Sequence, residues 1–181
     1  MYFDPDTKLM QFLPVAPSGS QPLAVGLAAY AAGDFAGALL TLAPLADKGD
    51  AEAQFVVGMV HAFGQDARRP VPRDFNRAWR YFHAATSQGH WRSAFNAGLL
   101  CLLSPRHTGQ SLNHPSTTIV ALLRLAAEWS DDGDVRERAH RLARMITMNI
   151  PEREQSRIAA AMNRLMREVG KPADSLASGT I

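Results

Sequence analysis

Six histidines and one cysteine are the residues of this chain with the widest range of chemistry. Two histidines four residues apart on a helix, with a third ligand nearby, would hold a zinc ion, and a thiolate beside a histidine would be a nucleophile. No two of these histidines have that arrangement. Cys101 lies in an apolar stretch, which indicates a small buried side chain. The sequence therefore predicts no catalytic residue and no metal site.

Acidic residues offer a second kind of chemistry. Asp131, Asp132 and Asp134 are spaced somewhat like calcium ligands, but the rest of the twelve-residue calcium loop is missing. Aspartates in this position favour the capping of a helix. The chain also has no glycine-rich phosphate loop, nucleophile elbow or carboxylate pair. We therefore expect a protein that is not an enzyme and that needs no cofactor.

Basic residues form two groups. Arg136, His140 and Arg144 recur every four residues and would share one helix face, which could meet the acidic side chains of a partner. The alternative is a solvated face without a partner. Glu137, Glu152 and Glu154 dilute the positive charge, so we do not expect a nucleic acid partner. The second group consists of Arg68, Arg69, Arg73, Arg77 and Arg80.

Composition indicates a folded helical protein. Of the 181 residues, 46% are apolar and 20% are charged, which argues against wholesale disorder. The net charge of +2 is unevenly distributed: residues 1–65 carry two basic and six acidic residues, whereas residues 66–181 carry seventeen basic and eleven acidic ones. This polarity could attract an acidic partner, or it could reflect the arginine-rich composition of a GC-rich genome.

Helix starts and ends can be placed from capping residues and from prolines and glycines. Asp34 and Asp74 should begin helices, Gly49 and Gly89 should end them with a left-handed residue, and Pro44 should bend the helix that contains it. The expected helices lie at about 23–32, 34–48, 51–63, 74–88, 91–103, 116–130, 135–148 and 152–169.

The two ends of the chain should lie outside this helical region. Residues 1–22 are expected to form an amino-terminal arm, in which Leu9, Met10, Phe12 and Leu13 make one amphipathic turn before several prolines prevent a longer helix. Residues 171–181 are expected to be a disordered tail. The helical domain itself is predicted over 23–170.

The helical pattern repeats after 40 residues. The residues of the first copy are Asp34, Phe35, Ala38, Gly49, Phe55 and Gly58, and each recurs in the same register at Asp74, Phe75, Ala78, Gly89, Phe95 and Gly98. A period of 20–50 residues is typical of stacked helical units, each of which buries its apolar face on its neighbours.

These residues resemble the Sel-one-like repeat family, a bacterial and eukaryotic branch of the tetratricopeptide-like superfamily. The resemblance is specific over 34–103; the segment 116–170 reads as a degenerate unit followed by a capping helix. This sequence departs from the family pattern at His61 and Cys101, where a tyrosine is expected. The matching segments are Gly58–Gly64, Val71–Asp74, Ala78–Tyr81 and Ala84–Gly89.

The resemblance implies an all-α fold, a right-handed α/α superhelical solenoid of stacked antiparallel helical hairpins. It also implies a non-catalytic adaptor or scaffold that binds a peptide or helix of another protein in a concave groove. An alternative is a self-assembling structural or antitoxin-like protein that uses the same apolar face to form homo-oligomers.

The first helix of each pair lines the concave side in tetratricopeptide-like proteins, and this resemblance selects the residues of the groove. Placing Gly58 and Gly98 in register turns six apolar side chains toward it. The alternative is that the amino-terminal arm, through Leu9, Phe12 and Leu13, or a second copy of the chain covers them. The six residues are Phe55, Met59, Phe63, Phe95, Leu99 and Leu102.

The expected compartment follows from features that the sequence lacks. A single cysteine excludes an internal disulfide bond. The chain starts without the positive charge and apolar run of a secretion signal, and no apolar stretch has the roughly 20 residues needed to cross a bilayer. We expect a cytoplasmic protein without a membrane span, or a periplasmic one if a signal was removed or the start is misassigned.

Overall fold

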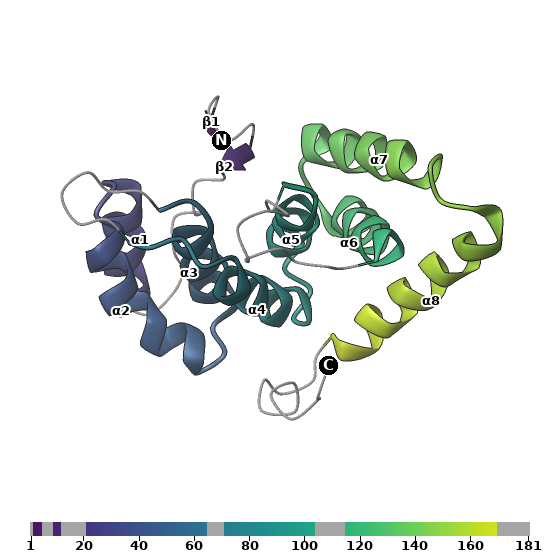
Figure 1. Cartoon of the computed structure of the whole chain (residues 1–181). Helices are drawn as coiled ribbons and strands as arrows, with labels where there is room; N and C mark the ends of the chain where they lie inside the picture. The colour runs from purple at the N-terminus through teal and green to yellow at the C-terminus, as the bar shows by residue number, and fades with distance from the viewer. Residues whose placement is uncertain (1, 5–8, 12–20, 65–70, 104–114, 170–181) are drawn as a thin grey trace. The chain divides into compact units, whose positions relative to one another are not determined.

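The computed structural model describes residues 2–4, 9–11, 21–64, 71–103 and 115–169, and their architecture is all-α apart from two short strands (Figure 1). The predicted tail at 171–181 lies outside the described residues. The elements are β1 Tyr2–Asp4, β2 Leu9–Gln11, α1 Gln21–Ala31, α2 Phe35–Asp47, α3 Ala51–Phe63, α4 Phe75–Thr86, α5 Trp91–Leu103, α6 Ser116–Trp129, α7 Gly133–Thr147 and α8 Glu152–Glu168.

The amino-terminal arm contains strands where the sequence predicted a helical turn. β1 and β2 pair in antiparallel fashion, with Phe3 opposite Met10. The prediction is therefore wrong for Leu9 and Met10, and Phe12 and Leu13 lie outside the described residues. Three residues are too few to show a period of two, and such a strand is stabilised by its partner strand rather than by its own pattern.

Helix α1 begins two residues earlier than the apolar pattern indicated. Pro22 belongs to the predicted arm over 1–22, but it is the second residue of α1. A proline is tolerated in the first turn because the backbone N–H that it lacks would have no helical acceptor there. Pro44 lies inside α2, where the carbonyl of Leu40 loses its helical donor.

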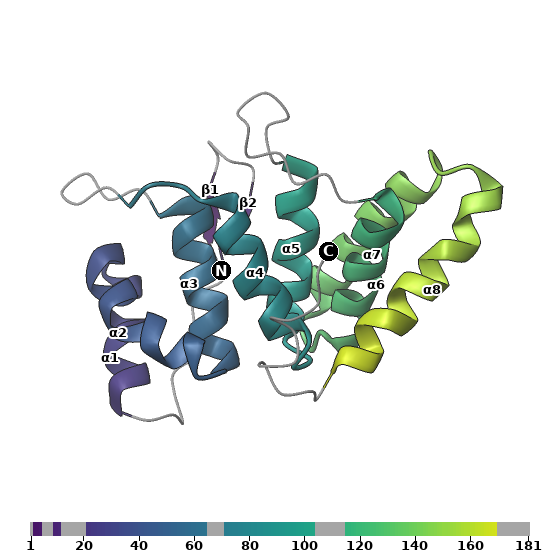
Figure 2. The same cartoon turned by 60° about the horizontal axis from the view of Figure 1, so that its bottom comes forward.

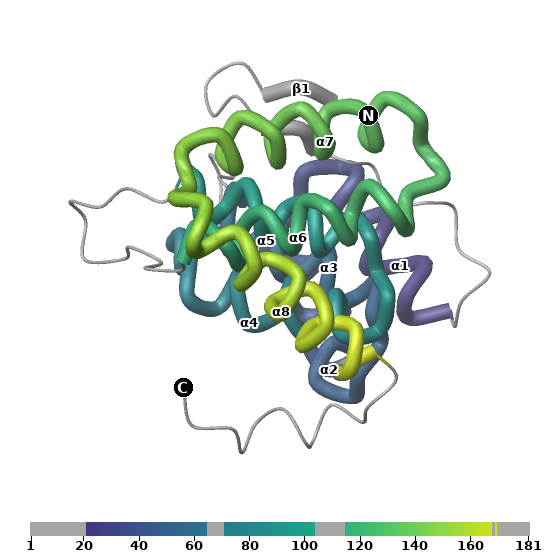
Figure 3. The backbone as a smooth tube through the Cα atoms, turned by 90° about the vertical axis from the view of Figure 1, so that its right-hand side faces the viewer, coloured from purple at the N-terminus to yellow at the C-terminus, as the bar shows by residue number. Residues whose placement is uncertain are grey.

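The chain divides into two compact units, Met1–Tyr81 and Phe82–Ile181, and the division falls within α4. In the first unit α2 packs against both α1 and α3 (Figure 2). In the second unit α6 is central and packs against α5, α7 and α8 (Figure 3). The predicted domain over 23–170 spans both units, and its boundaries stay a prediction.

Aspartates begin the helices as predicted. The Gly37 N–H donates to Asp34 Oδ1 at 2.9 Å, and the Arg77 N–H donates to Asp74 Oδ1 at the same distance. Each bond satisfies a backbone donor that has no partner within its own helix. Asp132 accepts in the same way from the first turn of α7, which confirms a capping role within the aspartate cluster.

Glycines end α2 and α4 in the same manner. Gly49 and Gly89 have φ values of 96° and 81°, a left-handed conformation that side chains other than glycine rarely adopt. The residue after each glycine also donates to a carbonyl five positions back. The four N–H···O distances are Gly49 to Ala46 3.0 Å, Asp50 to Leu45 3.0 Å, Gly89 to Thr86 2.9 Å and His90 to Ala85 3.1 Å.

Two glycines allow helices to approach closely. A Cβ atom at Gly98 of α5 would lie 3.1 Å from Leu123 Cδ2 of α6, which is tighter than ordinary van der Waals contact. A Cβ atom at Gly26 of α1 would collide with the Leu42 side chain of α2. Gly98 in the second unit and Gly26 in the first unit therefore have the same role.

Candidate functional site

Four of the six predicted groove residues are buried. Phe55 and Met59 of α3, and Phe95 and Leu99 of α5, belong to the core of the protein. As a surface for a partner, the predicted set is thus reduced to Phe63, which is partly exposed, and Leu102, which is 39% exposed. An apolar helix face is enclosed whenever other elements reach it, and the periodicity of one helix does not contain that information.

The apolar positions of α3 and α5 that keep contact with solvent lie at the ends of the two helices. Phe63 is the last residue of α3, and Leu102 and Leu103 are the last two of α5. Leu103 is 46% exposed and occupies the position 40 residues after Phe63. The side chain of Leu9 and the residues Phe12 and Leu13, the predicted cover of the groove, are not among the described parts of the chain.

Three titratable side chains are buried near the ends of α1, α3 and α5. Burial raises the pKa of Tyr30 well above its usual value and raises the pKa of Cys101 to about 12. Burial also lowers the pKa of His61, because the charged form of imidazole loses its hydration. At neutral pH all three groups are therefore uncharged, and Cys101 is a thiol rather than a nucleophilic thiolate.

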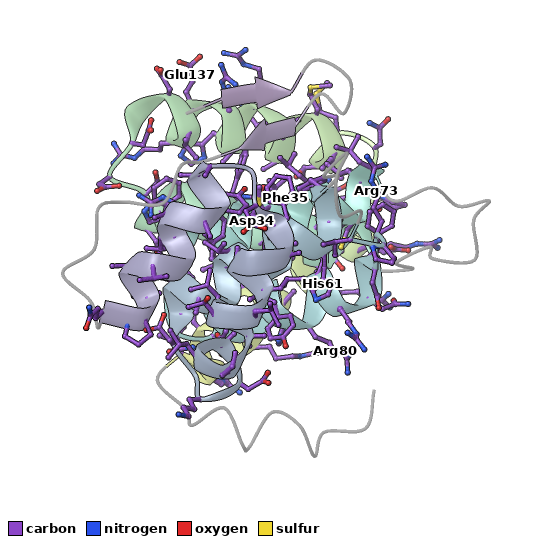
Figure 4. All side chains as sticks on the ribbon, turned by 90° about the vertical axis from the view of Figure 1, so that its left-hand side faces the viewer. Asp34, Phe35, His61, Arg73, Arg80 and Glu137 are labelled. Carbon is purple, nitrogen blue, oxygen red and sulfur yellow. The ribbon has the colours of Figure 1, made fainter. Side chains whose placement is uncertain are left out.

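His61 has the most elaborate surroundings of the three (Figure 4). Its ring stacks on Tyr81, with ring centres 6.1 Å apart and planes within 5° of parallel. Its Nδ1 atom is buried and has no hydrogen-bond partner among the described residues. Arg77 and Arg80 lower the pKa of His61 further, whereas Asp74 opposes them. This combination keeps the imidazole neutral.

Tyr81 extends the cluster to α2. Its hydroxyl donates to Asp47 Oδ1 at 2.9 Å, and burial and this bond raise the pKa of the phenol. The Asp74 N–H donates to the carbonyl of His61 at 2.9 Å. The cluster therefore joins the ends of α2 and α3 to the middle of α4 and to the residue before it. No three His, Cys, Asp or Glu side chains in the described part of the chain are grouped to hold a metal ion.

The predicted basic face on α7 is exposed, but one of its members is already engaged. The Arg136 guanidinium donates to the carbonyl of Ser130 at 2.6 Å and so satisfies a backbone acceptor at the end of α6. His140 and Arg144 are exposed on the same helix. Nearby, Arg141 pairs with Glu137, whose side chain points away from the helices (Figure 4).

A row of arginines on α8 was missed by the sequence analysis, which treated this helix only as a polar cap. Arg153, Arg157, Arg164 and Arg167 are all exposed. Their separations of four, seven and three residues are those of one helix face. A helical projection of residues 152–168 would therefore have found the row without a structure.

Comparison with protein families, with curated proteins and with solved structures gave no match. The resemblance to Sel-one-like repeats thus continues to depend on the residues quoted for it. Among the described residues, no helix combines the length and the apolar character needed to cross a membrane.

Proposed function

We propose that this protein is a non-catalytic interaction module, a right-handed solenoid of helical hairpins of the Sel-one-like kind that binds a segment of another protein. The observation that carries the proposal is the recurrence of local structure after 40 residues. α3 spans 51–63 and α5 spans 91–103, the same interval shifted by one period. Proteins built from such units typically use an extended surface for binding.

The equivalent hydrogen bonds support the same interpretation. The caps at Asp34 and Asp74, and the glycine turns at Gly49 and Gly89, have matching geometry. Ala38 and Ala78 are both fully buried, and so are Phe55 and Phe95. Residues that match in sequence therefore also match in conformation and burial, as expected of successive units of one repeat.

The surface best placed for a partner is the exposed apolar end of α5. Leu102 and Leu103 lose contact with water when they are covered, and each buried leucine side chain stabilises a complex by about 1.5–3 kcal/mol at most. Phe63 is the corresponding residue of α3. We propose the end of α5 as the contact point, in place of the buried residues predicted from the pattern.

A capture experiment tests the proposal. The tagged protein is used to capture partners from native lysate, beside a Leu102→Asp/Leu103→Asp variant and a Met145→Asp/Met148→Asp control. The control also changes two exposed apolar residues, one on α7 and one directly after it. Circular dichroism first establishes that both variants are folded. A partner that is lost with the α5 variant and kept with the control supports the proposal, and equal capture by all three proteins contradicts it.

Self-assembly is the second candidate, because the same exposed leucines could be covered by another copy of the chain. In that case the mass measured by light scattering rises with protein concentration. The Leu102→Asp/Leu103→Asp variant would then stay monomeric at the highest concentration tested. A wild-type protein that is monomeric throughout excludes this alternative.

A further inference from the structure

Helix α8 has two faces of opposite character. Ile158 and Leu165 are buried, and α8 packs against α6 (Figure 3). At 100° per residue these two side chains lie within about 20° of each other on the helix circumference. The four arginines named above lie on the far side, at about 180–260° from Ile158. The apolar face thus holds the helix in place and presents the arginines to solvent.

The arginine row is continuous. Arg153, Arg157, Arg164 and Arg167 occupy an arc of about 80° and extend over about 21 Å along the helix axis. The fifth position of the same arc is Ala160, which is exposed and too small to separate the guanidinium groups from a partner. Ser156 and Asn163 lie beside it and are exposed as well. A second helix can therefore approach along this side without steric conflict.

The row also differs from other arginines in its electrostatic partners. Arg77 pairs with Asp74, Arg141 pairs with Glu137, and Arg136 binds a backbone carbonyl. The four α8 arginines, by contrast, form no ion pair with any side chain that the structure describes. Four aligned cations repel one another, and this repulsion is relieved when a row of anions binds.

The spacing favours carboxylates on a helix over a nucleic acid. Glutamates on one face of a partner helix recur every three or four residues, which matches the separations in the row, and carboxylates form bidentate bonds with guanidinium groups. α7 and α8 contain no phenylalanine, tyrosine or tryptophan on which bases could stack. Glu152 and Glu154 of the first turn of α8 would repel a polyanion that extends beyond the row.

We propose that the arginine row of α8 docks an acidic amphipathic helix of a partner protein. This inference depends on the proposed function as an interaction module, and it adds the chemistry of the partner. It also places the acidic contact on α8, whereas the sequence placed it on Arg136, His140 and Arg144 of α7.

The test uses the full chain and a fluorescein-labelled helical peptide of about 21 residues, with four glutamates on one face at the spacing of the row. A second peptide has the same composition but its glutamates surround the helix. Binding is followed by fluorescence anisotropy at low and at physiological salt. The variants are Arg157→Gln/Arg164→Gln on α8 and, as a control of equal charge, Arg73→Gln/Arg80→Gln.

We expect the one-faced peptide to bind about fivefold more tightly than the other, and more weakly as salt is added. The α8 variant should raise its Kd about tenfold, and the control less than about twofold. Equal losses in both variants would indicate general charge attraction and overturn the proposal. The proposal would also be overturned if a thymidine oligonucleotide bound more tightly than the one-faced peptide and the α8 variant abolished that binding. The capture experiment with the α5 variant does not depend on these results, so either proposal can fail alone.

Discussion

The segments 34–63 and 74–103 have the same backbone but different buried chemistry. When one is shifted by 40 residues, the caps at Asp34 and Asp74 and the glycine turns coincide, and the helix bounds agree to within one residue. The buried side chain two residues before the end of the first segment is His61, stacked on Tyr81, whereas the equivalent residue of the second is the thiol Cys101. Caps and glycines therefore determine the backbone of the unit, while the buried side chain near the helix end can differ in its chemistry.

A second difference concerns the start of α3 and of α5. The carboxylate of Asp50 accepts from the Ala53 N–H at 2.8 Å. At the equivalent position the imidazole Nδ1 of His90 accepts from the Ser93 N–H at 3.3 Å and also contacts the Ser93 hydroxyl at 2.9 Å. Two side chains of different charge therefore serve one structural role, so the role depends on an acceptor atom and not on a charge.

The largest effect should come from the buried aromatic residues. Phe55→Ala and Phe95→Ala should each lower the free energy of unfolding by about 3–5 kcal/mol, because each removes a fully buried ring and leaves a cavity. Urea denaturation followed by circular dichroism gives both values. If the segments are equivalent, the two losses agree within about 1 kcal/mol. A loss of stability in only one variant would show that the two segments are not equivalent.

The glycine turns give the next effect. Gly49→Ala and Gly89→Ala should each cost about 1–2 kcal/mol, because alanine is strained at positive φ. Gly133→Ala is the matched control: its φ lies outside the left-handed region and its Cβ would have no neighbour within 4 Å. We expect this control to be neutral or slightly stabilising. Thermal denaturation of the three variants decides, and a destabilised Gly133→Ala would refute the conformational explanation.

The aspartate caps should have a smaller, equal effect. Asp34→Ala and Asp74→Ala should each cost about 1 kcal/mol, since both remove one hydrogen bond to an exposed first turn. The ion pair between Asp74 and Arg77 is exposed, so it should add little. Asparagine at either position keeps the acceptor and should restore most of the stability. Failure of both asparagine variants would indicate that the carboxylate charge matters more than the bond.

Much of this fold could be predicted because residues close to each helix end determine where the helix begins or ends. Asp34, Gly49 and Gly89 each begin or end a helix only a few residues away in the sequence, so their effect can be recognised from the sequence alone. The strand β2 could not, because it depends on pairing with β1. The burial of Phe55 and Met59 also depends on other elements, and the pattern of α3 does not show which ones cover it.

The site shows the same limit. Tyr81 bonds Asp47 across 34 residues of sequence, and His61 stacks on Tyr81 across a segment that includes a loop. No short spacing encodes such pairs. The arginine row of α8, by contrast, lies within one helix and could be recognised from spacing alone.

The smallest expected effect is on pH dependence, and it addresses the difference between His61 and Cys101 directly. The folded protein lowers the pKa of His61 below its unfolded value, so the unfolded chain binds a proton more readily. The stabilising contribution of the neutral imidazole is thus complete above about pH 6.5 and is lost as the pH falls through and below that value.

His61→Cys installs the residue of the second segment and should reduce the loss of stability between about pH 7 and pH 5. Urea midpoints measured across this range test it, with His140→Gln as a control because His140 is an exposed histidine. An unchanged slope in His61→Cys, or an equal change in His140→Gln, would mean that burial of the imidazole does not govern the acid sensitivity of the fold.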